Sequence, residues 1–325
     1  MAADISNQNT QTLLKSWADK GRYTSLRLGE KPLDIFYLDL GSPNASADKT
    51  LLILHGFPES SYSFHQVIDG LLQQFERLVL FDMLGYGLSS KPDVDVYSYS
   101  LIEQADTALM LWRVLGVEGG HLLSHDMGTS VATEIAYRDA NQLLPEFIST
   151  GIKSYTFTNG SMMLKHADLR IMQKALLSPL GSRLAQLSRY PLFKKQIISA
   201  HGSLQTNAHS LDEIEIKMLW AFQQCNNGKQ RIHHIIQYLN DRKRFENIRW
   251  LPALSDLSSK KPIHICWGEA DQVARVEIAR ELHEVICRES ALTLMPKVGH
   301  FCQLGSPETW LQAIINFYQQ LTTPM

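Results

Sequence analysis

An aspartate stands at the centre of the segment 124–128 (SHDMG), which follows the apolar run 121–123 (HLL). Small residues on both sides of a central side chain are typical of a tight strand-to-helix turn, because a bulky Cβ would clash there. A carboxylate has no proton to lose, so Asp126 could attack carbon without a base and leave an ester on the protein. That chemistry suits the opening of an epoxide or the displacement of halide. The alternative is an aspartate that caps the helix beginning near Met127.

Two other side chains follow predicted strands and could complete this chemistry. His300, in 297–301 (KVGHF), lies on the loop after the last predicted strand and is the candidate base. Asp271, in 267–271 (WGEAD), follows the preceding strand and is the candidate acid that orients the histidine. Glu269 competes for that role, and Asp271 is favoured by its position. The chain order nucleophile, acid, histidine is a known order for catalytic triads.

Backbone N–H groups could stabilise the oxyanion that forms when an ester on Asp126 is hydrolysed. The segment 55–58 (HGFP) follows the first buried parallel strand, at the edge where open α/β sheets bind ligands. We expect the N–H groups of Phe57 and Met127 to form this oxyanion hole.

Composition excludes several classes of function. The chain has 325 residues, a formal net charge of −2 and a pI of about 6.6, so no nucleic-acid partner is expected. No apolar run approaches the roughly 18 residues of a membrane span, and the polar N-terminus is not a signal peptide. The four cysteines show no CxxC spacing, so neither a metal nor a disulfide framework is expected. We expect a cytoplasmic protein without cofactors, and a homodimer remains open.

The hydrophobic pattern predicts an α/β fold in which strands alternate with helices, and therefore a mostly parallel eight-stranded sheet covered on both faces. The predicted strands are Tyr23–Leu28, Leu33–Leu40, Leu51–Leu54, Leu78–Phe81, His121–Leu123, Ile152–Phe157, Ile263–Trp267 and Leu292–Met295. The alternation stops between Asn159 and about Leu251, where the periodicity is helical. We therefore predict a core of residues 1–158 and 252–325, with a helical cap, 159–251, inserted after the sixth strand.

Together these motifs resemble the epoxide hydrolase and haloalkane dehalogenase branch of the α/β-hydrolase superfamily. The matching segments are HGFPESSYSFHQVI at 55–68, DMLGYGLSSKP at 82–92, SHDMGTS at 124–130, WGEAD at 267–271 and VGHFCQLGSPE at 298–308. Within the branch, LLSHDMGTSVATEIAYR and IIQYLNDRKRF resemble the mesoderm-specific transcript hydrolases. The resemblance implies an α/β-hydrolase fold with an inserted cap and a small apolar substrate, an epoxide or a haloalkane.

Departures from the dehalogenase pattern favour the epoxide. Dehalogenases usually have Trp after the nucleophile and Asn after the His-Gly pair, and the side-chain N–H groups of this Trp and Asn hold the halide. This chain has Met127 and Phe57 at the two positions, and neither side chain offers a donor. Epoxide hydrolases use cap tyrosines as acids. By resemblance, Tyr238 occupies the second tyrosine site, and Tyr190 is the best match for the first. The alternative for Tyr238 is an aromatic side chain packed under the cap.

The sequence therefore predicts an epoxide hydrolase that forms a covalent alkyl-enzyme ester and releases a vicinal diol. Asp126 would attack, Tyr238 with Tyr190 would protonate the oxygen, and His300 with Asp271 would activate water. A haloalkane dehalogenase is the first alternative. A non-catalytic binding protein or receptor on a hydrolase fold is the second.

Overall fold

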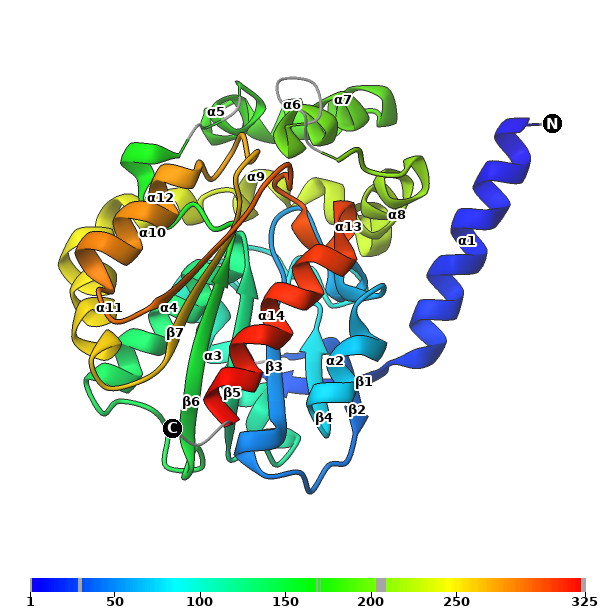
Figure 1. Ribbon diagram of the computed structural model, residues 1–325. Helices are drawn as coiled ribbons and strands as arrows, with labels where there is room; N and C mark the ends of the chain where they lie inside the picture. Colours follow the sequence, from blue (N-terminus) through cyan, green and yellow to red (C-terminus); the bar gives the residue numbers. More distant parts are fainter. Residues whose placement is uncertain (1, 29–30, 168, 170, 203–208, 323–325) are drawn as a thin grey trace.

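The computed structural model describes residues 2–28, 31–167, 169, 171–202 and 209–322 (Figure 1). Its central sheet has eight strands in the order β1-β2-β4-β3-β5-β6-β7-β8. β2 runs antiparallel to its neighbours β1 and β4, and the other neighbouring strands are parallel, which confirms the predicted sheet. The strands are β1 (Arg22–Arg27), β2 (Pro32–Gly41), β3 (Thr50–Leu54), β4 (Arg77–Phe81), β5 (Gly119–His125), β6 (Gly151–Thr158), β7 (Ile263–Gly268) and β8 (Ala291–Met295).

Helices cover both faces of the sheet, and for that reason β3 and β4 contain continuous apolar runs. Every residue of β3 is buried, and its alternate side chains enter opposite cores: Leu51 and Ile53 on one face, Leu52 and Leu54 on the other. The first face is covered by α2 (Ile68–Gln74) and α14 (Pro307–Thr322). The second is covered by α3 (Leu101–Val114), α4 (Met127–Ala140), α11 (Leu251–Ser258) and α12 (Val276–Glu281).

Short helices between β6 and α11 lie above the carboxyl ends of the strands (Figure 1). We call the elements from η3 to α10 and their connections the cap; its limits at 159 and 251 remain predictions. The cap contains η3 (Leu164–His166), α5 (Ile171–Leu177), α6 (Gly181–Leu187), α7 (Tyr190–His201), α8 (Glu213–Gln224), η4 (Cys225–Gln230), α9 (Ile232–Ile235) and α10 (Tyr238–Phe245). The remaining short helical segments are η1 (Ala47–Lys49), η2 (Ser61–Phe64), η5 (Glu246–Trp250), η6 (Leu282–Ile286) and α13 (Cys302–Gly305).

The N-terminal segment forms a helix that the sequence pattern did not predict, α1 (Ala2–Lys20), which projects away from the body of the protein (Figure 1). Trp17 fixes its C-terminal half. The Trp17 indole is 3% exposed, donates a hydrogen bond to Ser61 Oγ over 3.2 Å and packs edge-on against Tyr62. Within the described residues, no helix combines the length and the hydropathy needed to cross a bilayer.

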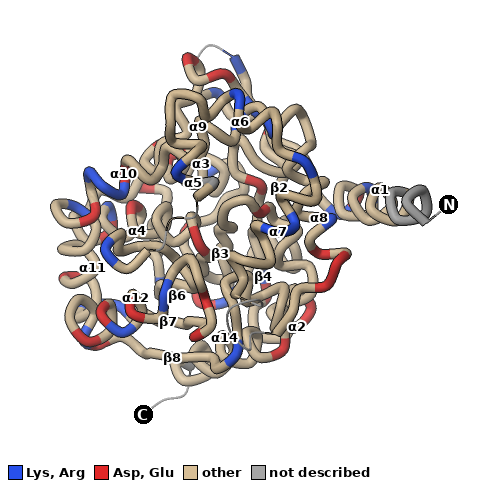
Figure 2. Tube along the Cα trace, turned by 90° about the horizontal axis from the view of Figure 1, so that it is seen from above, with Lys and Arg blue, Asp and Glu red and all other residues tan. Residues whose placement is uncertain are grey.

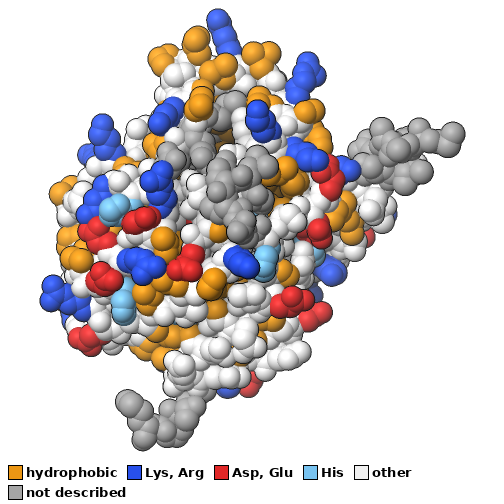
Figure 3. Space-filling view, turned by 45° about the horizontal axis from the view of Figure 1, so that its top comes forward, with side chains coloured by type: hydrophobic (Ala, Val, Ile, Leu, Met, Phe, Trp, Pro, Cys, Tyr) orange, Lys and Arg blue, Asp and Glu red, His pale blue; other side chains and the backbone are white. Residues whose placement is uncertain are grey.

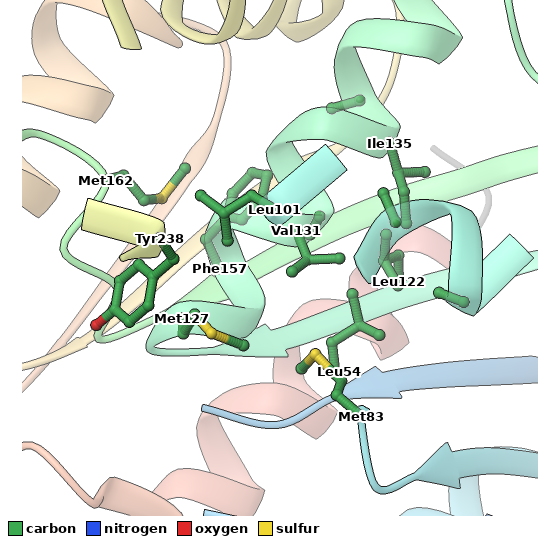
Figure 4. Packing of buried hydrophobic residues seen from close by; sticks show 14 of the residues in the cluster. Leu54, Met83, Leu101, Leu122, Met127, Val131, Ile135, Phe157, Met162 and Tyr238 are labelled. Carbon is green, nitrogen blue, oxygen red and sulfur yellow. The ribbon is translucent and has the colours of Figure 1, made fainter. Parts of the chain in front are cut away.

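The first helix after Asp126 is anchored by one apolar face. Met127 and Val131 are four residues apart on α4, as are Val131 and Ile135, so the three side chains share a face of the helix. Figure 4 shows this face packed toward Leu54 and Leu122 of β3 and β5. This packing fixes the start of α4 against the sheet.

A buried carboxylate joins α4 to the segment in which the chain returns from the cap. Glu134 is fully buried and accepts hydrogen bonds from Arg249 over 2.6 and 2.8 Å, from the Trp250 indole over 2.9 Å and from Arg138 over 3.0 Å. These donors offset the cost of burying the charge and hold the pKa of Glu134 below its usual value, although burial itself would raise it.

Replacing Glu134 by Gln should therefore destabilise the protein by about 3 kcal/mol, because two arginines then lose their buried partner. Urea denaturation followed by circular dichroism measures the change. Asp256→Asn is the matched control. It removes the exposed pair between Asp256 of α11 and Lys260 just after this helix, and should cost less than about 1 kcal/mol. Equal losses in both variants would contradict the role of Glu134.

Candidate active site

Asp126 lies at the junction of β5 and α4 in a strained backbone conformation, with φ 46° and ψ −115°. Close contacts with the end of β3 explain the small residues around it. A Cβ on Gly128 would lie 2.5 Å from the carbonyl oxygen of His55, and a Cβ on Gly56 would lie 2.5 Å from the Asp126 Cβ. The tight turn predicted from the sequence is thus imposed by the contact between two neighbouring strands.

The carboxylate of Asp126 faces the loop after β3. The Phe57 N–H donates a hydrogen bond to Asp126 Oδ2 over 2.8 Å. The side chain makes no capping hydrogen bond to α4, so the helix-cap alternative is not what the structure shows. Met127 is the first residue of α4, where backbone N–H groups have no partner within the helix.

His300 and Asp271 meet at the same edge of the sheet. His300 Nδ1 donates to Asp271 Oδ2 over 2.8 Å, and His300 Nε2 lies 3.6 Å from Asp126 Oδ1. The side chain of Asn159, just after β6, donates to the same Asp271 oxygen over 2.8 Å. The structure therefore brings the three predicted triad residues together, each at most 2% exposed.

The competing acid, Glu269, points the other way. Its carboxylate lies 3.4 Å from Arg280, and its side chain is 35% exposed. The second oxygen of Asp271 is instead held by backbone N–H groups, from Val273 over 2.7 Å and from Ala274 over 3.0 Å. The local turn after β7 thus selects Asp271 as the partner of the histidine.

Two carboxylates control the charge of His300. Burial alone would lower the pKa of His300, but Asp271 and then Asp126 outweigh it and raise that pKa to about 9. The imidazole is therefore protonated at neutral pH.

A third buried acid, Glu59, was not identified from the sequence, although it directly follows the 55–58 motif. It accepts hydrogen bonds from the Gly56 N–H over 2.9 Å and from Gln303 Nε2 over 2.8 Å. Burial and the charge of Asp126 raise the pKa of Glu59 to about 8, so this side chain is neutral at pH 7. An ionised Glu59 would add to Asp271 and Asp126 in raising the pKa of His300.

A cap residue that the sequence did not single out, His201, supports the loop of His300. The His201 carbonyl accepts from the His300 N–H over 3.2 Å, and His201 Nδ1 accepts from the Phe301 N–H over 3.2 Å. Its Nε2 donates to the His209 carbonyl over 2.8 Å. Burial lowers the pKa of His201 to about 4, so the ring stays neutral and Nδ1 remains an acceptor.

The two tyrosines predicted in the cap, Tyr238 and Tyr190, lie in different surroundings. Tyr238 opens α10, is 2% exposed and packs against Phe57 with ring centroids 6.3 Å apart; burial and the charge of Asp126 raise its pKa. Tyr190 does not reach the site, because its hydroxyl donates to Glu213 over 2.7 Å on an exposed part of the cap. A core tyrosine, Tyr86, contacts the residue that follows Asp126. Its hydroxyl contacts Met127 Sδ over 2.8 Å, and the charge of Asp126 adds to burial in raising its pKa.

A pocket of about 100 Å³ lies between the core and the cap, with Asp126 and His300 in its wall. Tyr238 is not part of that wall, but its ring contacts Phe57, which is. The described lining is mostly apolar and consists of Phe57, Pro58, Asp126, Gln173, Leu176, Leu184, Ala185, Ser188, Phe193, Gln196, Ile197, Ala200, Gln223, Ile232, Val273, His300 and Phe301. Among the described residues, no cluster of three or more His, Cys, Asp and Glu side chains could hold a metal ion.

Comparison with known proteins agrees with this architecture. Residues 49–307 match the family described as alpha/beta hydrolase fold. The putative hydrolase LipZ of Mycobacterium tuberculosis is 33% identical over 94% of this chain and 98% of its own length. The mesoderm-specific transcript protein of Mus musculus is 32% identical over 94% of this chain and 87% of its own. A haloalkane dehalogenase variant, DbeA-M1 from Bradyrhizobium elkanii, superposes with a TM-score of 0.69 at 17% identity, over 93% of this chain and 97% of its own.

The chain belongs to the α/β-hydrolase family, and it is similar to the mesoderm-specific transcript proteins within that family. The likeness to the solved dehalogenase extends to the fold alone. The activity must therefore be argued from the residues of the site.

The pairing of His300 with Asp271 can be tested by titration. In Asp271→Asn, the pKa of His300 should fall from about 9 toward the usual value of a histidine, because the largest charge that raises it is gone. NMR of histidine-labelled protein follows the titration, and the spectrum of His300→Gln assigns the signal. Glu269→Gln is the matched control and should leave the pKa of His300 unchanged. If Glu269→Gln lowers this pKa and Asp271→Asn does not, Glu269 is the partner of the histidine.

Proposed function

We propose that this protein is a hydrolase that forms a covalent ester on Asp126, and that an epoxide is its preferred substrate. One observation carries the proposal. One oxygen of the buried Asp126 carboxylate is held by the Phe57 N–H, while the other faces His300 Nε2 at 3.6 Å. A nucleophile with one oxygen fixed and a base candidate beside it suits formation and then hydrolysis of an ester.

In the first half-reaction, Asp126 Oδ1 attacks an epoxide carbon as the ring C–O bond breaks. The ring oxygen leaves as an alkoxide and takes the phenolic proton of Tyr238. The attack needs no base, because the carboxylate is already ionised. The protonated His300 favours this ionised state through its charge.

Ester formation then changes the charge state of the base. Alkylated Asp126 carries no charge, so one of the causes that raise the pKa of His300 disappears. The proton of His300 passes through solvent to the Tyr238 phenolate, and neutral His300 then takes a proton from water as the water oxygen attacks the ester carbonyl carbon. The Phe57 N–H stabilises the oxyanion, together with the free Met127 N–H at the start of α4. Collapse expels the product alkoxide, which takes the proton from His300, and the proton left on Asp126 then passes to His300, which restores the starting state.

Hydrogen-bond donors at the site favour the epoxide over the haloalkane. Epoxide opening needs an acid, and the ring of Tyr238 packs against Phe57 of the pocket wall. Halide departure needs N–H donors near the nucleophile, and the described pocket lining contains neither Trp nor Asn. Trp220, the cap tryptophan, packs instead against Phe193 and Tyr190.

Dehalogenation remains the second candidate because of three glutamines in the pocket wall. Gln173, Gln196 and Gln223 place amide groups in a mostly apolar lining, and their N–H groups could bind a departing halide. Wild-type protein that releases halide from haloalkanes, and produces no diol from any epoxide, would move the assignment to a dehalogenase.

Replacing His300 by Gln should block the second half-reaction alone, because water needs a base and the carboxylate does not. The variant should accumulate one substrate adduct per protein, visible by intact-protein mass spectrometry, with the modification on Asp126 in a peptide digest. Asp126→Ala is the control and should form no adduct. Failure of His300→Gln to alkylate would contradict this division between the two residues.

Replacing Tyr238 by Phe should slow epoxide opening by roughly 10²–10⁴-fold, since it removes the acid but keeps the ring. Single-turnover diol formation measures the rate. Tyr190→Phe is the matched control in the cap and should have no effect, since its hydroxyl binds Glu213. If Tyr86→Phe slows the reaction while Tyr238→Phe does not, the proton donor belongs to the core instead.

A further inference from the structure

The charge of the cap differs from that of the rest of the chain. Residues 169–211 include no Asp or Glu, whereas the whole chain has 33 acidic and 31 basic side chains. The basic residues of this segment are Arg170, Lys174, Arg183, Arg189, Lys194 and Lys195. A protein with a formal net charge of −2 thus carries a locally positive segment.

Residues 169–211 contain the helices α5, α6 and α7. Large hydrophobic side chains are exposed on these three helices and on their connections. Their exposed fractions are 87% for Ile171, 70% for Leu187, 57% for Leu180 and 43% for Leu192. Single exposed hydrophobic residues are ordinary, but a group of them beside cations is typical of an interaction surface. Figure 3 shows hydrophobic and basic side chains together over the cap, and acidic side chains lower on the molecule.

The cations of this surface are free to bind a partner. Lys174, Arg183, Arg189 and Lys195 are exposed, and none of them forms an ion pair with a described residue. Figure 2, which views the molecule from above, shows basic residues beside the labels of α6 and α7. We call these four side chains and the four exposed hydrophobic ones the cap face.

The inner sides of the same helices already have a role. Leu176 of α5, Leu184 of α6 and Phe193 of α7 line the pocket that contains Asp126. The cap face is therefore the outer side of the pocket roof, and a partner bound to it would lie next to the pocket.

We propose that the cap face docks on the surface of a bilayer that contains anionic lipids. Isoleucine and leucine side chains can enter the headgroup region while Lys and Arg bind lipid phosphates, which is the composition that interfacial helices use. A second copy of this chain is a poor partner for the face, because two positive surfaces repel. The basic residues come from three helices, and for that reason no basic run marks this surface in the sequence.

Vesicle sedimentation of the full chain tests the proposal without reference to catalysis. We expect binding to vesicles of phosphatidylcholine mixed with phosphatidylglycerol, little binding to phosphatidylcholine alone, and loss of binding at high salt. Arg183→Ser/Leu187→Ser removes one cation and one leucine, four residues apart on α6, and neither side chain lines the pocket. Its affinity should fall by at least about fivefold, the effect of one charge near an anionic surface.

The matched control is Arg113→Ser/Val114→Ser, which removes an exposed cation and an exposed valine at the end of α3, far from the cap. It should bind vesicles like the wild type. Circular dichroism checks that both variants fold. The proposal is overturned by equal weakening in both variants, by no binding to anionic vesicles, or by binding to soluble polyglutamate in place of vesicles, which would indicate an acidic protein partner.

Discussion

The contact between the end of β3 and the turn after β5 is the constraint on which the site depends. Gly56 and Gly128 let the two backbones approach closely, and Asp126 adopts a positive φ at this contact. The same approach brings the Phe57 N–H within 2.8 Å of the Asp126 carboxylate. Because β3 and β5 are neighbours in the sheet, strand order alone unites nucleophile and donor from segments about 70 residues apart.

Burial makes the charges of the site act strongly on one another. His300 lies between Asp271 and Asp126 with little water to screen them, and its protonation state follows the charge on Asp126. Glu59 would disturb this relation if it were ionised, but its own burial keeps it neutral at pH 7. The order of the two proposed half-reactions then follows from electrostatics without a conformational change.

The parts of the fold and site that depend on local sequence could be predicted, whereas those that depend on distant contacts could not. Continuous apolar runs located the buried strands, and the small residues around Asp126 indicated its turn. Tyr190 was expected at the site by resemblance, but its hydroxyl binds Glu213, which lies on the next helix of the cap. The neutral state of Glu59 and the helical state of α1 depend on burial and packing, which no short motif encodes.

The hydrogen bonds of His201 limit how the cap can be exchanged between related proteins. A cap inserted into a core looks like a separate module that the cap of a related protein could replace. Here the cap supplies the acceptors for the N–H groups of His300 and Phe301, so a foreign cap would leave two buried backbone donors unsatisfied beside the base. The cap and the loop that carries His300 must therefore be inherited, or transplanted, as one unit.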